Sequence, residues 1–251
     1  MKIAVCGQGF VGRAVSASLK HFHDLVGIDP KLGSQTVRDI EDVDCVIVCV
    51  PTPQGPKGEC DVSYIAQVLD TVQDNTPTLI KSTTSISGWT SIVRQFPRHE
   101  LTFSPEFLRQ DTSIEDFANS RDMYFGGSGR CVEFWIDRIF LPVFPNCNYH
   151  HVSVEEAILI KYFRNSFLAT KVIWFNEAKR IAEQEGCDWE SVRKGVAGDS
   201  RIGDSHSHVS EAGGYGGACF PKDVQALLYD YEHSLVKRAH EWNQHNREED
   251  Q

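Results

Sequence analysis

Cys219 has the setting that most clearly suggests chemistry. It follows the run Gly213–Ala218, whose four glycines let the backbone approach a ligand closely, and it precedes Pro221. Proline favours the first turn of a helix, so the sequence predicts a helix start here with Phe220 as its cap. A thiol at a helix N-terminus lies beside unpaired N–H groups, which favour a nucleophilic thiolate. A buried structural cysteine is the alternative, and Asp223, four residues on, argues against it.

A second glycine pattern, Gly7-x-Gly9-x-x-Gly12, lies between a predicted strand and a predicted helix, and Asp29 closes the next strand. In this context the pattern predicts a dinucleotide site, because the glycines bring the backbone close to a pyrophosphate at the helix N-terminus. Asp29 can accept hydrogen bonds from a ribose diol and would repel a 2′-phosphate, so NAD is favoured over NADP. A glycine-rich turn without a ligand is the alternative.

Four further polar residues are site candidates. Lys161 and Asn165 are four apart on a predicted helix and share one face. If these two polar side chains are buried in an apolar helix, their burial is unfavourable unless other groups pair with them. The alternative is a pair at the edge of the helix that faces solvent, and the helix pattern alone favours neither. Thr83 and Glu106 each follow a predicted strand, and ligands of such sheets bind beyond the carboxyl ends of strands. Caps of the following helices are the alternative there.

The scaffold of the first part alternates strands with helices. Apolar strands are predicted at 3–6, 25–28, 45–50, 78–81, 101–103 and 123–125, with helices at 10–20, 61–73 and 87–95. This alternation predicts an α/β fold: a Rossmann-like, doubly wound parallel sheet covered on both faces. The stretch between Asp29 and the third strand is too short for the usual crossover helix.

The pattern changes near Val152. Ser153 and Glu156 form a capping box, after which neither glycine nor proline interrupts the chain until Gly186. The sequence therefore predicts a long central helix that is apolar over much of its circumference and covered on several sides. A second copy of the chain is a candidate for that cover, and a small helical domain follows.

Length and charge bound the remaining possibilities. The 251 residues suit an NAD-binding domain at 1–151 and a helical dimerisation and catalytic-cysteine domain at 152–251. The formal charge of -10 argues against nucleic-acid partners and anionic membranes. The longest apolar run, Cys45–Val50, is too short to span a bilayer.

The cysteines and histidines indicate a compartment and argue against a metal. The N-terminus lacks a signal-peptide pattern, and the eight scattered cysteines suggest reduced thiols, so we expect a cytoplasmic protein. His206 and His208 have no partners at metal spacing, and we expect no metal.

Taken together, the motifs resemble those of the UDP-glucose/GDP-mannose dehydrogenase family. Two of the matching pieces, Asp199–Gly203 and Gly213–Asp223, are specific to that family. The others, in family order, are Gly7–Gly12 with Asp29, Val50–Pro53, Lys81–Thr83, Ser104–Arg109, Lys161-x-x-x-Asn165 and Phe175–Glu177.

The resemblance implies oxidation of a sugar CH2OH group to a carboxylate with two NAD+ and no metal. It implies that Cys219 adds to the intermediate aldehyde and passes through a thiohemiacetal to a thioester, which water hydrolyses. It places Lys161 and Asn165 at the developing oxyanion, and Asp223 and Thr83 beside the water.

The resemblance also implies the remaining contacts. Glu106 would be the general base of hydrolysis, and Phe107, Leu108 and the backbone near Gly216 would line the sugar pocket. The implied NAD contacts are Gly7, Gly9, Phe10, Val11, Gly12, Asp29, Lys31, Pro51, Thr52 and Thr83.

Three features depart from the family pattern. Gln110 stands where relatives usually have a second glutamate, and His206, His208 and Ala212 stand where relatives often place phosphate-contacting residues. The resemblance implies that full-length relatives continue into a second nucleotide-binding domain, and we expect this domain to be missing here. We therefore expect either a partner chain, a smaller binding surface or a substrate other than a nucleotide sugar. A homodimer through the helix at 153–186 is expected, as in the family.

Two other functions are compatible with parts of the pattern. A two-electron dehydrogenase of the β-hydroxyacid type shares the dinucleotide domain and Lys-x-x-x-Asn, but does not need Cys219 or its glycine loop. A catalytically idle NAD-binding dimer would lose the polar site residues freely, so their retention argues against it.

Overall fold

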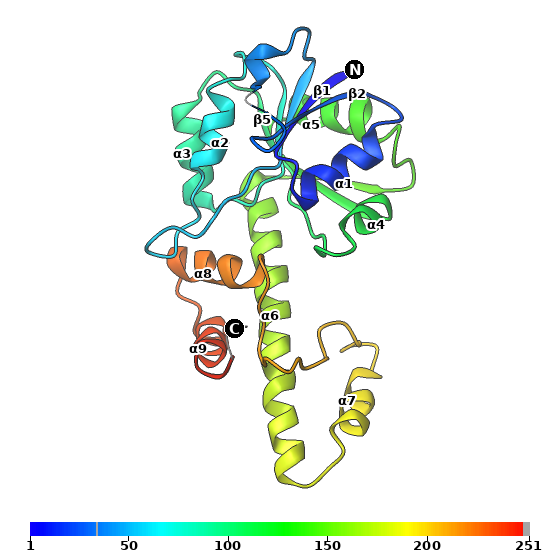
Figure 1. Cartoon of the computed structure of the whole chain (residues 1–251), viewed down its shortest axis with the longest axis vertical. Helices are drawn as coiled ribbons and strands as arrows, with labels where there is room; N and C mark the ends of the chain where they lie inside the picture. The colour runs from blue at the N-terminus through cyan, green and yellow to red at the C-terminus, as the bar shows by residue number, and fades with distance from the viewer. Residues whose placement is uncertain (34, 248–251) are drawn as a thin grey trace. The chain divides into compact units, whose positions relative to one another are not determined.

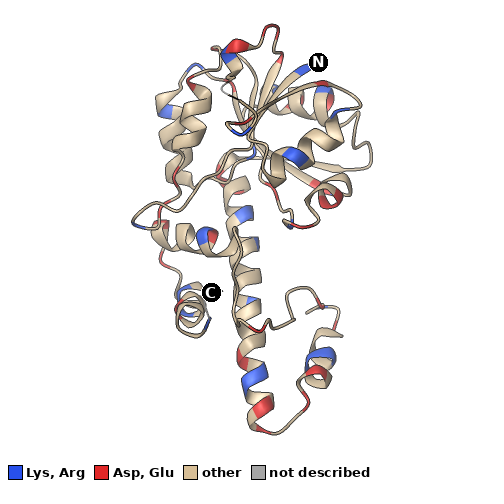
Figure 2. Ribbon diagram, in the orientation of Figure 1, with Lys and Arg blue, Asp and Glu red and all other residues tan. Residues whose placement is uncertain are grey.

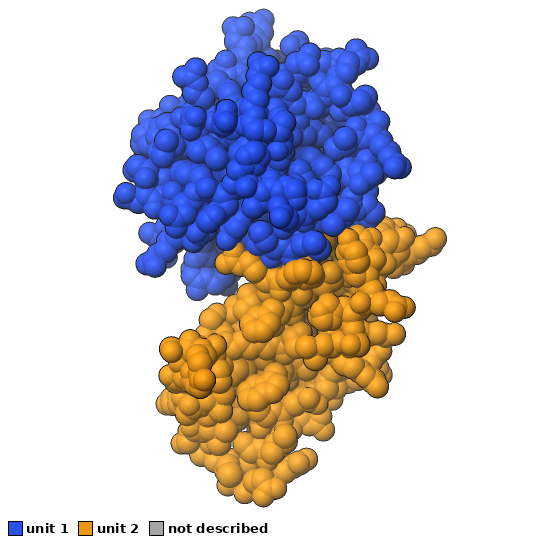
Figure 3. All heavy atoms as spheres, turned by 180° about the vertical axis from the view of Figure 1, so that it is seen from behind, with its two compact units in different colours: residues 1–53, 60–161 blue, residues 54–59, 162–251 orange. Residues whose placement is uncertain are grey.

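The computed structural model describes residues 1–33 and 35–247 and divides into two compact units. Figure 3 distinguishes unit 1, residues 1–53 and 60–161, from unit 2, residues 54–59 and 162–251.

The division lies inside the long helix α6 (Val154–Gln184), after Lys161, whereas the sequence placed a boundary before that helix at 151. Packing at the start of α6 explains the difference. A Cβ added to Gly126, at the end of a strand of unit 1, would lie 2.6 Å from the Cα of Val154. The first turns of α6 therefore pack as part of unit 1, and the rest of the helix belongs to unit 2.

Unit 1 is built on a seven-stranded sheet in the order β2-β1-β3-β4-β5-β6-β7. The strands are β1 (Lys2–Cys6), β2 (Asp24–Ile28), β3 (Cys45–Val48), β4 (Thr78–Ile80), β5 (Leu101–Phe103), β6 (Asp122–Gly126) and β7 (Asn148–Val152). The neighbouring strands are parallel except β5 and β6. The predicted Rossmann-like fold is confirmed, and the sheet is mostly parallel, with one antiparallel pairing between β5 and β6. The chain leaves β5 and re-enters the sheet from the same edge, so β6 runs antiparallel to β5.

Helices cover the two faces of this sheet. Figure 1 shows α2 and α3 on one side and α1, α4 and α5 on the other. The elements are α1 (Phe10–Leu19), the 3-10 turn η1 (Val37–Asp39), α2 (Ser63–Leu69), α3 (Ile86–Gln95), α4 (Ser113–Ala118), α5 (Gly129–Phe134) and the π-helical η2 (Trp135–Phe140). Among the described residues between β2 and β3, η1 is the only helical element, which confirms the short crossover expected after Asp29. Strand residues such as Ile3, Val5 and Ile47 are fully buried in the core between sheet and helices.

Unit 2 contains most of α6, followed by α7 (Trp189–Ala197), α8 (Phe220–Asp230) and α9 (Ser234–Asn246). The predicted capping box at the start of α6 is confirmed: Ser153 N–H donates to Glu156 Oε2 (2.7 Å), and Glu156 N–H donates to Ser153 Oγ (3.1 Å). Toward its C-terminal end α6 carries charges of both signs (Figure 2). Along residues 1–33 and 35–247, no helix is long and apolar enough to cross a membrane.

Candidate functional site

The turn after β1 is built so that only glycine fits at two of its positions. Gly7 has φ +90°, and a Cβ there would lie 2.5 Å from the carbonyl oxygen of Cys49. A Cβ on Gly12 would lie 1.8 Å from the carbonyl oxygen of Gly7. Gly9, the cap of α1, faces open space instead, and an added Cβ would meet nothing within 4 Å. The turn is thus closed tightly while the start of α1 stays open, which fits a pyrophosphate approaching the helix N-terminus.

Asp29 is fixed beside this turn by two backbone donors. Its Oδ2 accepts from Gln8 N–H (2.7 Å) and its Oδ1 from Lys31 N–H (2.9 Å), and these bonds hold the pKa of the carboxyl below its ordinary value. Asp29 follows β2, which pairs with β1, and its carboxylate bonds the turn after β1, the strand at which the strand order reverses. The arrangement fits the predicted contact with a ribose diol.

The predicted contacts beyond β3 and β4 lie on two adjacent segments. Ser82 Oγ donates to the carbonyl oxygen of Val50 (2.8 Å) and so joins these segments. Thr52 is buried, Pro51 is exposed and Thr83 is half-buried, with its carbonyl accepting from the thiol of Cys60 (3.5 Å). The structure therefore places Thr52 and Thr83 on the same edge of the sheet as the glycine turn.

Glu106 is held by two lysines. Lys81, with a side chain only 1% exposed, pairs with Glu106 Oε1 and also donates to Ser104 Oγ (3.2 Å). Lys161 Nζ donates to the backbone carbonyl oxygen of Glu106 (2.5 Å). Lys81 was missed as a site residue by the sequence reasoning. A lysine that ends a buried apolar strand is the signal that could have identified it, because such a charge requires a partner.

The two residues after Glu106 have different surroundings. The ring of Phe107 lies 5.6 Å from Lys161 Nζ, and Leu108 is half-buried and packs on the core of unit 1. Arg109 then forms an ion pair with Asp116 (2.6 Å), which lowers the pKa of Asp116 to about 2. This pair fixes the segment that follows the predicted sugar contacts.

In unit 2, Cys219 is itself the N-cap of α8, so the prediction that Phe220 caps this helix was wrong. Phe220 and Pro221 are the first two helical residues, because proline is tolerated throughout the first turn. The thiol is half-buried. Burial raises the pKa of the Cys6 and Cys45 thiols to about 12, which removes these two as nucleophiles at neutral pH.

One turn after Cys219, Asp223 forms the centre of a buried polar cluster. Its Oδ2 accepts from Asn165 Nδ2 (2.6 Å) and its Oδ1 from Lys222 Nζ (2.6 Å). Asn165 and Lys161 are only 7% and 8% exposed, which excludes an edge pair facing solvent. Lys161 lies in unit 1 and bonds Glu106, whereas Asn165 lies in unit 2 and bonds Asp223. The sequence analysis did not assign a role to Lys222, which pairs with the adjacent residue Asp223.

The loop before Cys219 has the backbone that its glycines allow. Gly213, Gly214 and Gly217 have φ of +69°, +57° and +77°. Gly216 has no such φ, but a Cβ there would lie 2.5 Å from Nη2 of Arg247, so the predicted pocket position is closely approached by a guanidinium.

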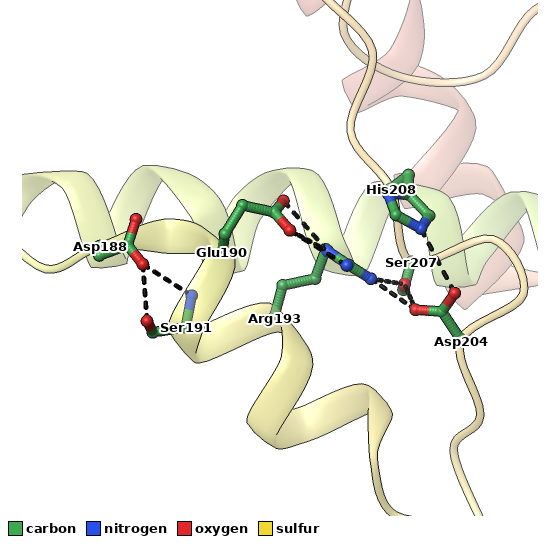
Figure 4. A network of polar contacts seen from close by, with 7 residues as sticks. All are labelled: Asp188, Glu190, Ser191, Arg193, Asp204, Ser207 and His208. Carbon is green, nitrogen blue, oxygen red and sulfur yellow. Dashed lines mark hydrogen bonds and ion pairs between the residues drawn. The ribbon is translucent and has the colours of Figure 1, made fainter.

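The segment before the glycine loop is ordered by a buried arginine. Arg193 of α7 bonds Glu190 (3.1 Å), Asp204 (2.5 Å) and Ser207 (2.8 Å), and Asp204 also pairs with His208 (3.3 Å) (Figure 4). Two departures from the family pattern are therefore part of this region. His208 belongs to the network, and His206 lies between Asp204 and His208 in the sequence. No group of three His, Cys, Asp or Glu in the described part of the chain is placed to hold a metal ion.

The fold and the glycine turn define an α/β dinucleotide-binding protein with a helical second unit. The chain belongs to the UDP-glucose/GDP-mannose dehydrogenase family: residues 30–142 match its NAD-binding domain and residues 155–245 its central domain. NAD is the cofactor of that domain.

Individual relatives agree with this assignment. UDP-glucose 6-dehydrogenase of Rickettsia bellii is 31% identical over 199 aligned positions, and the alignment covers 76% of this chain and 45% of that relative. UDP-glucose 6-dehydrogenase TuaD of Bacillus subtilis is 30% identical over 81% of this chain and 47% of its own length. The chain thus spans about half the length of the curated relatives it matches.

Solved structures show the same fold. A UDP-glucose dehydrogenase from Pyrobaculum islandicum aligns with a TM-score of 0.82 at 24% identity, covering 97% of this chain and 68% of that one. A 3-hydroxyisobutyrate dehydrogenase from Mycobacterium tuberculosis aligns with a TM-score of 0.71 at 18% identity, covering 97% and 93%. At these identities the likeness concerns the fold alone.

Proposed function

We propose that this chain oxidises the CH2OH group of a nucleotide sugar to a carboxylate, with Cys219 as the covalent nucleophile. The observation that carries the proposal is the thiol at the N-cap of α8, one turn before the buried pair of Asp223 and Asn165. A thiol in this position provides a covalent route to a four-electron oxidation, because it holds the aldehyde for the second oxidation.

The covalent steps balance with two NAD+. Bound NAD+ supplies a hydride acceptor for each of the two oxidations. After the first, Cys219 Sγ forms a bond to the aldehyde carbon, and the carbonyl oxygen takes a proton to give a thiohemiacetal. Loss of a hydride and the hydroxyl proton gives a thioester. Water then adds to the thioester carbon and the C–S bond breaks, which releases the carboxylate and the thiol.

The polar residues have distinct tasks in this proposal. Asn165 has a second Nδ2 hydrogen beyond the one given to Asp223, and we assign it to the oxygen that becomes negative. Lys161, one turn earlier on α6, supplies positive charge. Asp223 orients Asn165 and, with Thr83, positions the water.

Glu106 accepts the proton of that water in this proposal. Its Oε1 faces Lys81, so the proton transfer falls to Oε2. The backbone bond from Lys161 fixes the peptide that carries this carboxylate.

Product stoichiometry tests the function. The wild-type chain is incubated with NAD+ and a panel of UDP- and GDP-sugars, alongside Cys219→Ser and the control Cys187→Ser, which alters an exposed cysteine. Two NADH per acid, lost in C219S and kept in C187S, is the expected result. One NADH with an unaffected C219S would indicate a two-electron dehydrogenase of the β-hydroxyacid type. NAD binding without turnover of any sugar would indicate an idle NAD-binding dimer.

We also propose a homodimer formed through α6. Four large apolar side chains on this helix are more than half exposed: Phe163, Phe167, Trp174 and Ile181. Their spacing of four and seven residues places them along one side of the helix.

A further inference from the structure

The loop before Cys219 is rich in glycine, so the loop itself contains little that restricts its conformation. Three of its glycines, Gly213, Gly214 and Gly217, have positive φ, and glycine loses more conformational freedom on folding than any other residue. A loop with few side chains to bury needs external contacts to keep one shape.

Two buried asparagines supply such contacts. Asn176 Oδ1, from α6, accepts from Gly214 N–H (2.9 Å). Asn243, from α9, accepts from Tyr215 N–H through Oδ1 (2.7 Å) and donates from Nδ2 to the carbonyl oxygen of Tyr215 (3.1 Å). The side chain of Asn243 thus pairs with both polar groups of one residue, as a neighbouring β-strand would. The two asparagines are only 4% and 7% exposed.

The amide group is the feature that this arrangement requires. A side-chain amide offers a donor and an acceptor on one carbon, whereas a carboxylate only accepts. The amide of Asn176 is further oriented by its Nδ2, which donates to the carbonyl oxygen of Val172 (2.8 Å). An added Cβ on Gly214 would lie 2.2 Å from Asn243 Oδ1, so the asparagine occupies the space that any other residue at 214 would need.

Tyr215, the loop residue held by Asn243, is also linked to α8, the helix that Cys219 caps. The hydroxyl of Tyr215 bonds His240 Nδ1 (3.0 Å), and His240 Nε2 bonds Gln225 Oε1 of α8 (2.9 Å). The ring of Tyr215 also lies edge-on to Phe220, the first residue of α8, with centroids 6.2 Å apart. Movement at Tyr215 is therefore coupled to the start of α8, where the thiol lies.

We propose that Asn176 and Asn243 are positioning residues that clamp the glycine loop and thereby fix the location of the Cys219 thiol. The position of the thiol matters for catalysis only if the proposed function is correct, so the inference rests on that function. The clamping of the loop does not depend on it. Neither asparagine acts on substrate or cofactor in this proposal.

Hydrogen exchange of the full chain, followed by mass spectrometry, tests the clamp without a substrate. Asn243→Asp keeps the acceptor for Tyr215 N–H and removes the donor to its carbonyl, and Asn176→Ala removes the bond to Gly214. Asn246→Asp is the matched control, because the side chain of Asn246 is exposed and, among the described residues, bonds only the carbonyl of Trp242 within α9. We expect exchange across 214–219 to accelerate about tenfold in N243D and N176A, the size expected for one lost buried hydrogen bond, and not in N246D.

Two outcomes overturn the proposal. One is exchange at 216–219 that stays at the wild-type rate in both N243D and N176A. The other is an active wild-type enzyme whose kcat is unchanged in both variants. The clamp predicts that kcat falls by about tenfold or more, because the nucleophile is misplaced, while KM for NAD+ is unchanged. If wild-type protein oxidises no sugar, the proposed function fails, and the exchange comparison still decides the clamp.

Discussion

At the scale of single residues, the ion pair between Lys81 and Glu106 in unit 1 is almost enclosed by protein. Lys81 is almost fully buried and its Nζ also lies 5.6 Å and 5.5 Å from the ring centroids of Phe117 and Phe140. Charges in such surroundings are costly when left alone, so each partner depends on the other. The pair therefore combines a structural role with the positioning of the proposed general base.

A double-mutant cycle measures this dependence. Lys81→Met leaves the carboxylate of Glu106 buried without its partner and is expected to lower the free energy of unfolding by about 3 kcal/mol. Glu106→Gln added to K81M removes the uncompensated charge, so the double variant should be more stable than K81M. The measurement is urea unfolding of the wild type, K81M, E106Q and the double variant. Strictly additive changes in the free energy of unfolding would contradict the coupling.

At the scale of elements, the glycine turn joins β1 to α1 with different demands at each position. Gly7 and Gly12 are enclosed by backbone, so a side chain there requires the turn to move. The space around Gly9 is open, so local packing does not explain why this position has no side chain. A ligand that approaches the backbone is the reason that remains.

Two alanine substitutions separate these roles. Gly9→Ala is expected to leave thermal unfolding close to wild type and to weaken NAD+ binding about tenfold or more, because the methyl group projects toward the pyrophosphate. Gly12→Ala is expected to lower stability as well, because its Cβ would overlap the carbonyl of Gly7. Calorimetric titration with NAD+ and thermal melts provide both readouts. Unchanged NAD+ affinity in G9A would place the cofactor elsewhere.

At the scale of the whole molecule, the exposed side of α6 is the feature that a single copy leaves unexplained. Phe167 and Ile181 are 69% and 62% exposed, and Phe163 and Trp174 continue the same side. Apolar surface gathered on one helix side usually marks an interaction site. The proposed homodimer would bury it.

A charge placed on this side tests the dimer. Phe167→Glu is expected to convert a dimer into a monomer at micromolar concentration, because burying an unpaired carboxylate is unfavourable. Leu235→Glu is the matched control, since Leu235 of α9 is 63% exposed and lies on another helix. Light scattering after size exclusion gives the mass. A monomeric wild-type protein would contradict the proposal, as would an unaffected F167E.

The features that the sequence by itself determined are those whose causes lie close together along the chain. The approach of Gly12 to Gly7 and the capping box at Ser153 depend on residues within a few positions of one another, and the short crossover after Asp29 follows from the length of one segment. Their conformations follow from local sterics and local hydrogen bonds, so periodicity and residue type were sufficient.

The tertiary structure decided which side chains meet. Asn165 and Asp223 are 58 residues apart, Asn243 and Tyr215 are 28 apart, and Lys81 and Ser104 are 23 apart. The antiparallel pairing of β6 with β5 likewise depends on the path of the chain across the sheet. Such contacts leave no periodic trace in the sequence, because a buried donor or charge only requires some partner, and the packing of distant segments decides which one it receives.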